Sequence, residues 1–298
     1  MTALAFGTPR KLPSARTLDG RVVVLDIAFA SDSTFEKVTK KLIDGLGPRL
    51  AAWVDHHDHA LHTEYSRDKR FVLSTKAQHP ACPEMITPAL VARIGAVDTI
   101  VCHTDFDGLC AAAKWLREGV EPYPGADADA RAIDTRMGTP SPIGERFDRA
   151  IRGRPHDEGL FGLVVRHLSS GLSDAGLWAP IDAAATEHAA QEAEARRHAQ
   201  RFERLRGTPH GVAYVDVTSD FEARRKPYDK TLLLLLGQER EKIAVVVDRD
   251  TVSIAAAFDS GIDFLALFKL SGGMPTRVSV PRARLGDVFA ALGVDAPV

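Results

Sequence analysis

Cysteine and long apolar runs are both scarce in this chain of 298 residues, and each scarcity excludes a class of protein. The three cysteines, Cys82, Cys102 and Cys110, are odd in number and lack Cys-x-x-Cys spacing. This argues against a disulfide framework and a thiolate zinc site, and it favours a reducing cytoplasm. No apolar run approaches membrane-spanning length, and the first 20 residues lack the apolar core and cleavage site of a secretion signal. We therefore expect a cytoplasmic protein with no membrane partner.

Net charge is also small, because 38 Lys and Arg residues face 40 Asp and Glu residues, for a formal charge of -2. Without a global basic field, any nucleotide ligand must be held by a local site. The chain also has no Walker loop, no Rossmann glycine fingerprint and no nucleophile elbow. Its 45% hydrophobic and 26% charged residues are ordinary for a globular protein with one large or two medium domains.

Short apolar runs alternate with helical patterns in the first half of the chain, after an irregular lead-in over residues 1–20. The runs predict strands at 21–29, 50–54, 71–74, 98–102 and 130–133, and the patterns between them predict helices at 35–47, 88–94 and 109–116. Strands and helices that alternate in this way predict a doubly wound α/β domain with a mainly parallel sheet, which we place at residues 1–165.

The remainder of the chain has a different pattern. Residues 180–205 are rich in helix formers, carry charges of both signs and contain no glycine, so they predict a long exposed helix inside a connector at 166–206. On that helix His188 and His198 are most simply solvated. Strands at 212–217, 242–247 and 252–256, with helices at 263–270 and 285–292, predict a smaller α+β domain at 207–298.

Acids and imidazoles follow several of the predicted strands. Asp26 lies near the end of the first, the triplet Asp55-His56-His57 follows the second, and the loop HTDFDG at 103–108 follows the fourth. Because open α/β sheets place ligands at the carboxyl ends of their strands, these side chains predict a metal site. Carboxylates and imidazoles suit Mn²⁺ or Mg²⁺, with Mn²⁺ favoured where histidine takes part. The alternative is that Asp105 and Asp107 cap the next helix and His103 is an ordinary loop residue.

The segments WVDHHDH and HTDFDGLCAAA resemble the DHH phosphoesterase superfamily. Its members include single-strand exonucleases, nano-RNases, cyclic-dinucleotide phosphodiesterases and manganese-dependent pyrophosphatases. The first signature of the family is matched by His103, Asp105 and Asp107, the second by Asp26 and the third by Asp55, His56 and His57, while Asp134 is the candidate for the fourth. The order differs from that of the family, in which the His-x-Asp-x-Asp loop comes first. A circular permutation within the sheet would reconcile the two orders.

The C-terminal region, from Val252 to Val280, more weakly resembles the DHH-associated domain, in which a Gly-Gly-His turn closes over the substrate. Gly272 and Gly273 are in place, but Met274 follows them, and residues 254–257 lack the arginine of the preceding strand. The substrate clamp is therefore altered or lost. Arg277 would be a replacement phosphate ligand, although a surface arginine with no partner is the more ordinary reading.

The resemblance implies a two-metal hydrolase with two Mn²⁺ ions, or Mg²⁺ in their place. Asp26 would bridge the ions, His103 and Asp105 would bind one, and Asp107 and His56 the other. His57 would contact the scissile phosphate, and Asp55 would orient an imidazole. The expected reaction is hydrolysis of a phosphate ester in a small nucleotide or short single-stranded oligonucleotide by an activated water. The alternative is a non-catalytic or weakly active nucleotide-binding or regulatory protein, and either could form a homodimer.

Overall fold

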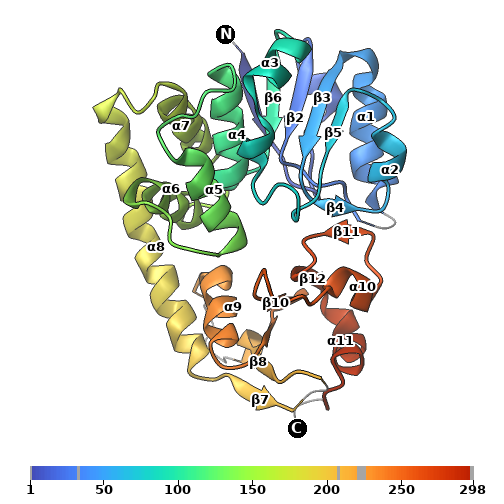
Figure 1. Cartoon of the computed structure of the whole chain (residues 1–298). Coiled ribbons are helices and arrows are strands. Elements are labelled where there is room, and N and C mark those ends of the chain that lie inside the picture. Colours follow the sequence, from blue (N-terminus) through green and yellow to red (C-terminus); the bar gives the residue numbers. More distant parts are fainter. Residues whose placement is uncertain (1, 32–33, 207–208, 220–225, 296–298) are drawn as a thin grey trace. The chain divides into compact units, whose positions relative to one another are not determined.

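The computed structural model describes residues 2–31, 34–206, 209–219 and 226–295. The chain forms two compact units, one made of Met1–Thr186 with Ser271–Gly273 and the other of Glu187–Leu270 with Met274–Val298. Figure 1 shows the elements of both. Within the described ranges, no helix has both the length and the apolar character required to cross a lipid bilayer.

The first unit is built on a sheet of five parallel strands. Their spatial order is β1 (Ala3–Phe6), β6 (Thr99–Cys102), β2 (Val22–Leu25), β3 (Leu50–Asp55) and β5 (Phe71–Leu73). The central strand β2 is apolar at every position because both faces of the sheet are covered. Val22 and Val24 point into one core, and Val23 and Leu25 point into the other. The predicted α/β class with a parallel sheet is confirmed.

Helices cover both faces of this sheet (Figure 1). On one face lie α1 (Lys41–Leu46), which continues a π-helical turn at Glu36–Lys40, and α2 (His62–Tyr65). On the other face lie α3 (Pro88–Ile94) and α4 (Phe106–Leu116). Packed on α4 are α5 (Ala126–Thr135), α6 (Pro142–Gly153) and α7 (Glu158–Ser169).

Two expectations for this unit are wrong. Residues 1–20 are not wholly irregular, because residues 3–6 form β1 and pair with β6 at the edge of the sheet. Residues 130–133 are not a strand but part of helix α5. There Ala126, Ala130 and Ile133 recur at helical spacing and pack into the core below α4. A four-residue apolar window was too short to distinguish the two periods.

The boundary between the units falls inside α8 (Trp178–Ala199). The helix predicted to reach residue 205 ends at 199, and Glu203–Leu205 form strand β7. The helix is also not exposed along its whole length, because Ala195 and Ala199 pack into the core of the second unit. His188 is fully buried, with Nε2 3.1 Å from Oδ2 of Asp229, and His198 is nearly so. The reading of both histidines as solvated is therefore wrong.

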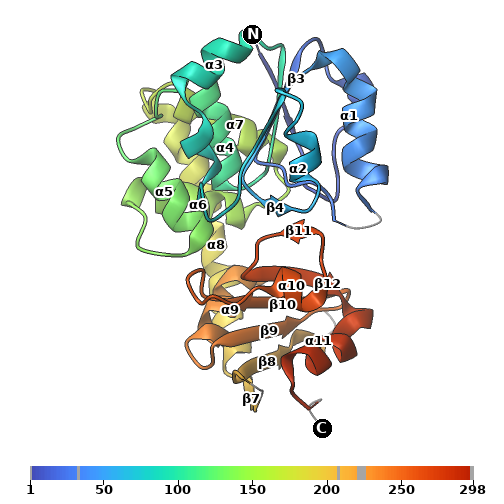
Figure 2. The same cartoon turned by 45° about the vertical axis from the view of Figure 1, so that its right-hand side comes forward.

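The second unit contains a mixed sheet in the order β12 (Arg277–Pro281), β10 (Thr251–Ala256), β9 (Ile243–Val247), β8 (Val212–Asp216) and β7. Only β8 and β9 are parallel. Helix α9 (Lys230–Gln238) covers one face, and α10 (Phe264–Phe268) with α11 (Leu285–Leu292) covers the other (Figure 2). This is the α+β arrangement expected for this part of the chain.

Candidate metal centre

The strands that carry the predicted ligands are neighbours, since β6, β2 and β3 lie side by side and run in the same direction. Their carboxyl ends therefore bring distant segments of the chain to one edge of the sheet. Asp26 follows β2 directly and has a φ of 59°, which few residues other than glycine adopt. Its N–H donates to the carbonyl of Val54 at 2.9 Å. Backbone strain of this kind is typically retained at functional sites.

Seven side chains at this edge form three overlapping groups, and within each group the potential ligand atoms lie within 4.8 Å of one another. The groups are Asp26 with His56 and His57, Asp26 with His103 and Asp105, and His56 with Asp107 and Asp134. Asp26 and His56 each belong to two groups. The groups include all six side chains that the sequence predicts as metal ligands, so the fold brings these distant segments together.

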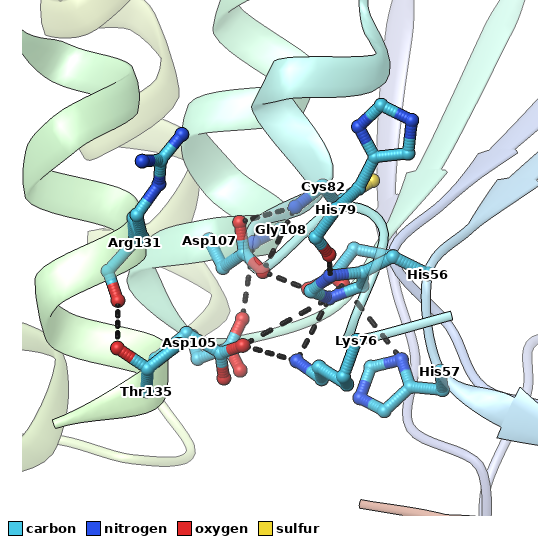
Figure 3. A network of polar contacts seen from close by, with 12 residues as sticks. His56, His57, Lys76, His79, Cys82, Asp105, Asp107, Gly108, Arg131 and Thr135 are labelled. Carbon is cyan, nitrogen blue, oxygen red and sulfur yellow. Dashed lines mark hydrogen bonds and ion pairs between the residues drawn. The ribbon is translucent and has the colours of Figure 1, made fainter. Parts of the chain in front are cut away.

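His56 is fully buried at the middle of the cluster (Figure 3). Its Nδ1 lies 2.7 Å from the carbonyl oxygen of His79, which can only accept a hydrogen bond, so Nδ1 carries a proton. Nε2 lies 3.0 Å from Oδ1 of Asp26 and 3.1 Å from Oδ2 of Asp107. The His79 carbonyl thus orients the ring so that Nε2 is the atom offered to a metal.

His57 is oriented by Asp55, whose Oδ1 lies 2.8 Å from its Nδ1. Asp55 is fully buried, but the neighbouring His57 imidazole outweighs the effect of burial and lowers the pKa of Asp55 to about 2. Burial and the Lys76 ammonium together lower the pKa of His57 to about 4. At neutral pH His57 is therefore a neutral imidazole that donates from Nδ1 to a carboxylate and presents a lone pair at Nε2.

The two aspartates of the loop at 103–108 have different partners. Asp105 caps α4, since its Oδ1 accepts from the N–H of Gly108 at 3.0 Å, while its Oδ2 lies 2.8 Å from Nδ1 of His103. Asp107 does not cap the helix. Its carboxylate is buried and accepts from the backbone N–H of Cys82 at 3.0 and 3.2 Å. The oxygens of Asp107 therefore face the cluster from a fixed position.

The pKa values of Asp105 and Asp107 are shifted in opposite directions. Burial opposes the ionised form of Asp105, yet the adjacent His103 imidazolium holds the pKa of Asp105 well below its usual value. Burial also disfavours the charged form of His103, but the Asp105 carboxylate outweighs burial and raises the pKa of His103 to about 9. By contrast, burial raises the pKa of Asp107 to about 6.

Asp26 is the least satisfied acid in the cluster. Burial, reinforced by the Asp107 and Asp105 carboxylates, raises the pKa of Asp26 well above its usual value. Neither of its oxygens accepts a well-formed hydrogen bond from a residue that the structure describes, although Nε2 of His56 lies close to one of them. A buried carboxylate that lacks hydrogen-bond donors and is repelled by neighbouring carboxylates fits a divalent cation, which supplies the missing positive charge.

Two members of the cluster do not come from where the sequence suggested. Asp134 lies on the last turn of α5 rather than after a strand, and it forms an ion pair with Lys76. Lys76 was not predicted. Its side chain is 2% exposed, and it follows β5 by three residues. The signal that would have found Lys76 is the one that found Asp26, namely a charged residue just beyond the end of a parallel strand.

The predicted substrate residues lie in different units. Gly272 and Gly273 form the short strand β11, which belongs to the first unit and pairs with β4 (Asp58–His59), directly after the Asp-His-His triplet. A Cβ at Gly272 would collide with the His59 ring and lie 2.7 Å from the carbonyl of Asp58, so only glycine fits. Arg277 lies in β12 of the second unit, where its Nη2 donates to Oγ1 of Thr231 at 2.8 Å. The reading of Arg277 as an arginine without a partner is therefore wrong.

Comparisons with known proteins add little to this geometry. No family model matches the chain, and neither does any curated protein. Among solved structures, that of the exonuclease RecJ bound to manganese is similar, with 13% identity and a TM-score of 0.43 over 91% of this chain and 74% of that one. A TM-score of this size carries no argument about function, so the case for a function depends on the site itself.

Proposed function

We propose that the chain is a metal-dependent phosphoesterase that hydrolyses a phosphate ester in a small nucleotide or short oligonucleotide. The observation that carries this proposal is the sharing of Asp26 and His56 between adjacent groups of ligand atoms at one sheet edge. Ligands shared in this way place a bound cation beside a second group of potential ligands at the same sheet edge, an arrangement that suits phosphoryl transfer. The Asp-His-His and His-x-Asp-x-Asp-Gly motifs, which resemble those of DHH phosphoesterases, support the same reaction class.

In this proposal Asp26, His103 and Asp105 hold a divalent ion, and His56, Asp107 and Asp134 form the neighbouring group. When bound, a divalent cation such as Mn²⁺ supplies Lewis-acid activation of a water and neutralises phosphate charge. Asp55 keeps Nδ1 of His57 protonated, which leaves Nε2 as an acceptor. Because the pKa of His57 is about 4, that acceptor is available at neutral pH to a water or to a phosphate-bound hydroxyl.

The test is Mn²⁺-dependent hydrolysis of bis(p-nitrophenyl) phosphate and of dinucleotides by the parent, Asp107→Ala and Asp127→Ala. Asp127 is the control because it is a half-buried aspartate of the same unit that pairs with Lys114 and belongs to none of the ligand groups. We expect Asp107→Ala to hydrolyse both substrates at least about a hundredfold more slowly than the parent, the size of loss that removal of a catalytic group typically causes. We expect Asp127→Ala to hydrolyse them at nearly the rate of the parent. Equal rates in Asp107→Ala and the parent would refute the proposal.

A second candidate function is nucleotide binding without catalysis. It is favoured by Lys76, whose ammonium contacts the same Asp134 and His56 atoms that would bind a metal, and by Met274 in place of histidine after the Gly-Gly turn. A parent protein that binds Mn²⁺ and dinucleotides but hydrolyses neither substrate would establish this candidate over the enzyme.

A further inference from the structure

Lys76 is a buried cation in the middle of a cluster built from metal-ligand side chains. It lies in the loop after β5, and its backbone N–H is 3.3 Å from Oδ2 of Asp58. Its side chain extends into the protein, where it is 2% exposed, and its Nζ lies 2.9 Å from Nε2 of His56. The same Nζ forms an ion pair with Asp134.

The atoms that Lys76 contacts are those that a metal would use. His56 has only one free ring nitrogen, Nε2, because the His79 carbonyl occupies Nδ1, and Lys76 faces that nitrogen. The Asp134 oxygen in contact with Nζ is also the one that lies nearest to His56, at 4.0 Å. An ammonium and a divalent ion cannot both use these two atoms. Lys76 therefore competes with a metal for the group made by His56, Asp107 and Asp134.

The charge of Lys76 suits this position. Its ammonium is buried in contact with the Asp134 carboxylate and with the His56 ring, whose Nε2 also lies within 3.1 Å of carboxylate oxygens of Asp26 and Asp107. Removing an ammonium from water is costly unless an anion lies close to it, and Asp134 is in contact with this one. The ammonium thus supplies part of the positive charge that the carboxylates of the cluster need.

The other buried lysine of this unit shows that such a side chain need not enter the cluster. Lys114 is 5% exposed and forms an ion pair with Asp127. Asp127 lies on α5, the helix that also carries Asp134. It also donates to the carbonyl of Pro83 at 2.9 Å, and none of its partners belongs to a ligand group. Lys76 and Lys114 therefore make similar ion pairs to α5, and only Lys76 occupies potential metal-ligand atoms.

We propose that the Lys76 ammonium takes the place of one divalent cation, so that the centre binds a single ion, held by Asp26, His103 and Asp105. This inference rests on the proposed function, since it concerns the same centre. A fixed ammonium neutralises the charge of a phosphate group but does not act as a Lewis acid toward water. The water would therefore be activated at the site formed by Asp26, His103 and Asp105. The rate of hydrolysis would depend on the occupancy of that one site.

The test is the number of Mn²⁺ ions bound per chain by the metal-stripped protein. It is measured by isothermal titration calorimetry and by the electron paramagnetic resonance signal of the Mn²⁺ left free. We expect one ion in the parent, two in Lys76→Met and one in Lys114→Met. Lys114→Met is the matched control because it also removes a buried lysine that pairs with α5.

A second variant keeps the inference testable if Lys76→Met does not fold, as judged by circular dichroism. In Asp134→Asn the proposal expects one bound Mn²⁺ with its Kd changed less than threefold, because Asp134 neutralises Lys76 rather than a metal. Two ions in the parent, one ion in a folded Lys76→Met, or a tenfold weaker ion in Asp134→Asn would each overturn the inference and leave the proposed function standing. No ion in any of the proteins would instead refute the proposed function, and the inference with it.

Discussion

Gly108 offers a stringent test of the loop that carries His103 and Asp105. It lies in the first turn of α4, and an added Cβ would be 2.7 Å from both the Cβ and the carbonyl oxygen of His103. Neither atom is the end of a flexible side chain, so Gly108→Ala must displace the backbone. Overpacking of this kind costs about 1–3 kcal/mol, against about 1 kcal/mol returned by the higher helix propensity of alanine. Because both contacts are this short and involve atoms that cannot move without the backbone, we expect a cost at the upper end of that range. The net destabilisation is then about 2 kcal/mol.

The matched control is Gly162→Ala in α7. A Cβ at Gly162 meets no described atom within 4 Å beyond its own helix and chain neighbours, so only the gain in propensity remains. We expect this variant to be more stable by about 0.5–1 kcal/mol. Urea unfolding of the metal-free proteins measures both values, and the two variants should differ by about 3 kcal/mol.

Mn²⁺ affinity gives an independent measure of the same displacement. Gly108→Ala moves His103 and Asp105 away from Asp26, and we expect its Kd to rise at least tenfold, which corresponds to about 1.4 kcal/mol. Gly162→Ala should bind like the parent. If Gly108→Ala unfolds at the same urea concentration as Gly162→Ala and binds Mn²⁺ equally well, the reasoning about this loop is wrong.

Two further predictions concern buried groups. Asp26→Asn removes a carboxylate whose ionised form is disfavoured by burial and by the neighbouring carboxylates. Thermal melts should therefore show that the metal-free variant is about 3 °C more stable than the parent and that Mn²⁺ no longer stabilises it. A melting temperature below that of the parent would contradict this prediction. Burial lowers the pKa of His167 below 6.5, so the unfolded chain binds its proton first and stability falls as the pH drops below that value. His167→Leu should therefore lose less stability than the parent between about pH 7 and pH 5 in urea titrations, whereas equal losses would exclude His167 as a cause.

The sequence by itself determined the central strands of the first sheet and most of the candidate ligands. The central strands at 22–25, 50–55 and 99–102 are short apolar runs, and their pattern depends only on their own residues and on burial of both faces. Because ligands in such sheets gather at the carboxyl ends of the strands, the residues after each run could be grouped before any contact was known. Asp26, His56 and the loop at 103–108 were found in this way.

The tertiary structure alone decided which charges are buried and what they face. Asp134 reaches the cluster from a helix because Ala126, Ala130 and Ile133 pack below α4, and this contact depends on a segment distant in sequence. The sequence places Lys76 just beyond the end of a strand, but only the fold shows that its ammonium lies among three carboxylates. The free energy of a buried charge is set by partners that other segments supply, so no local pattern records it.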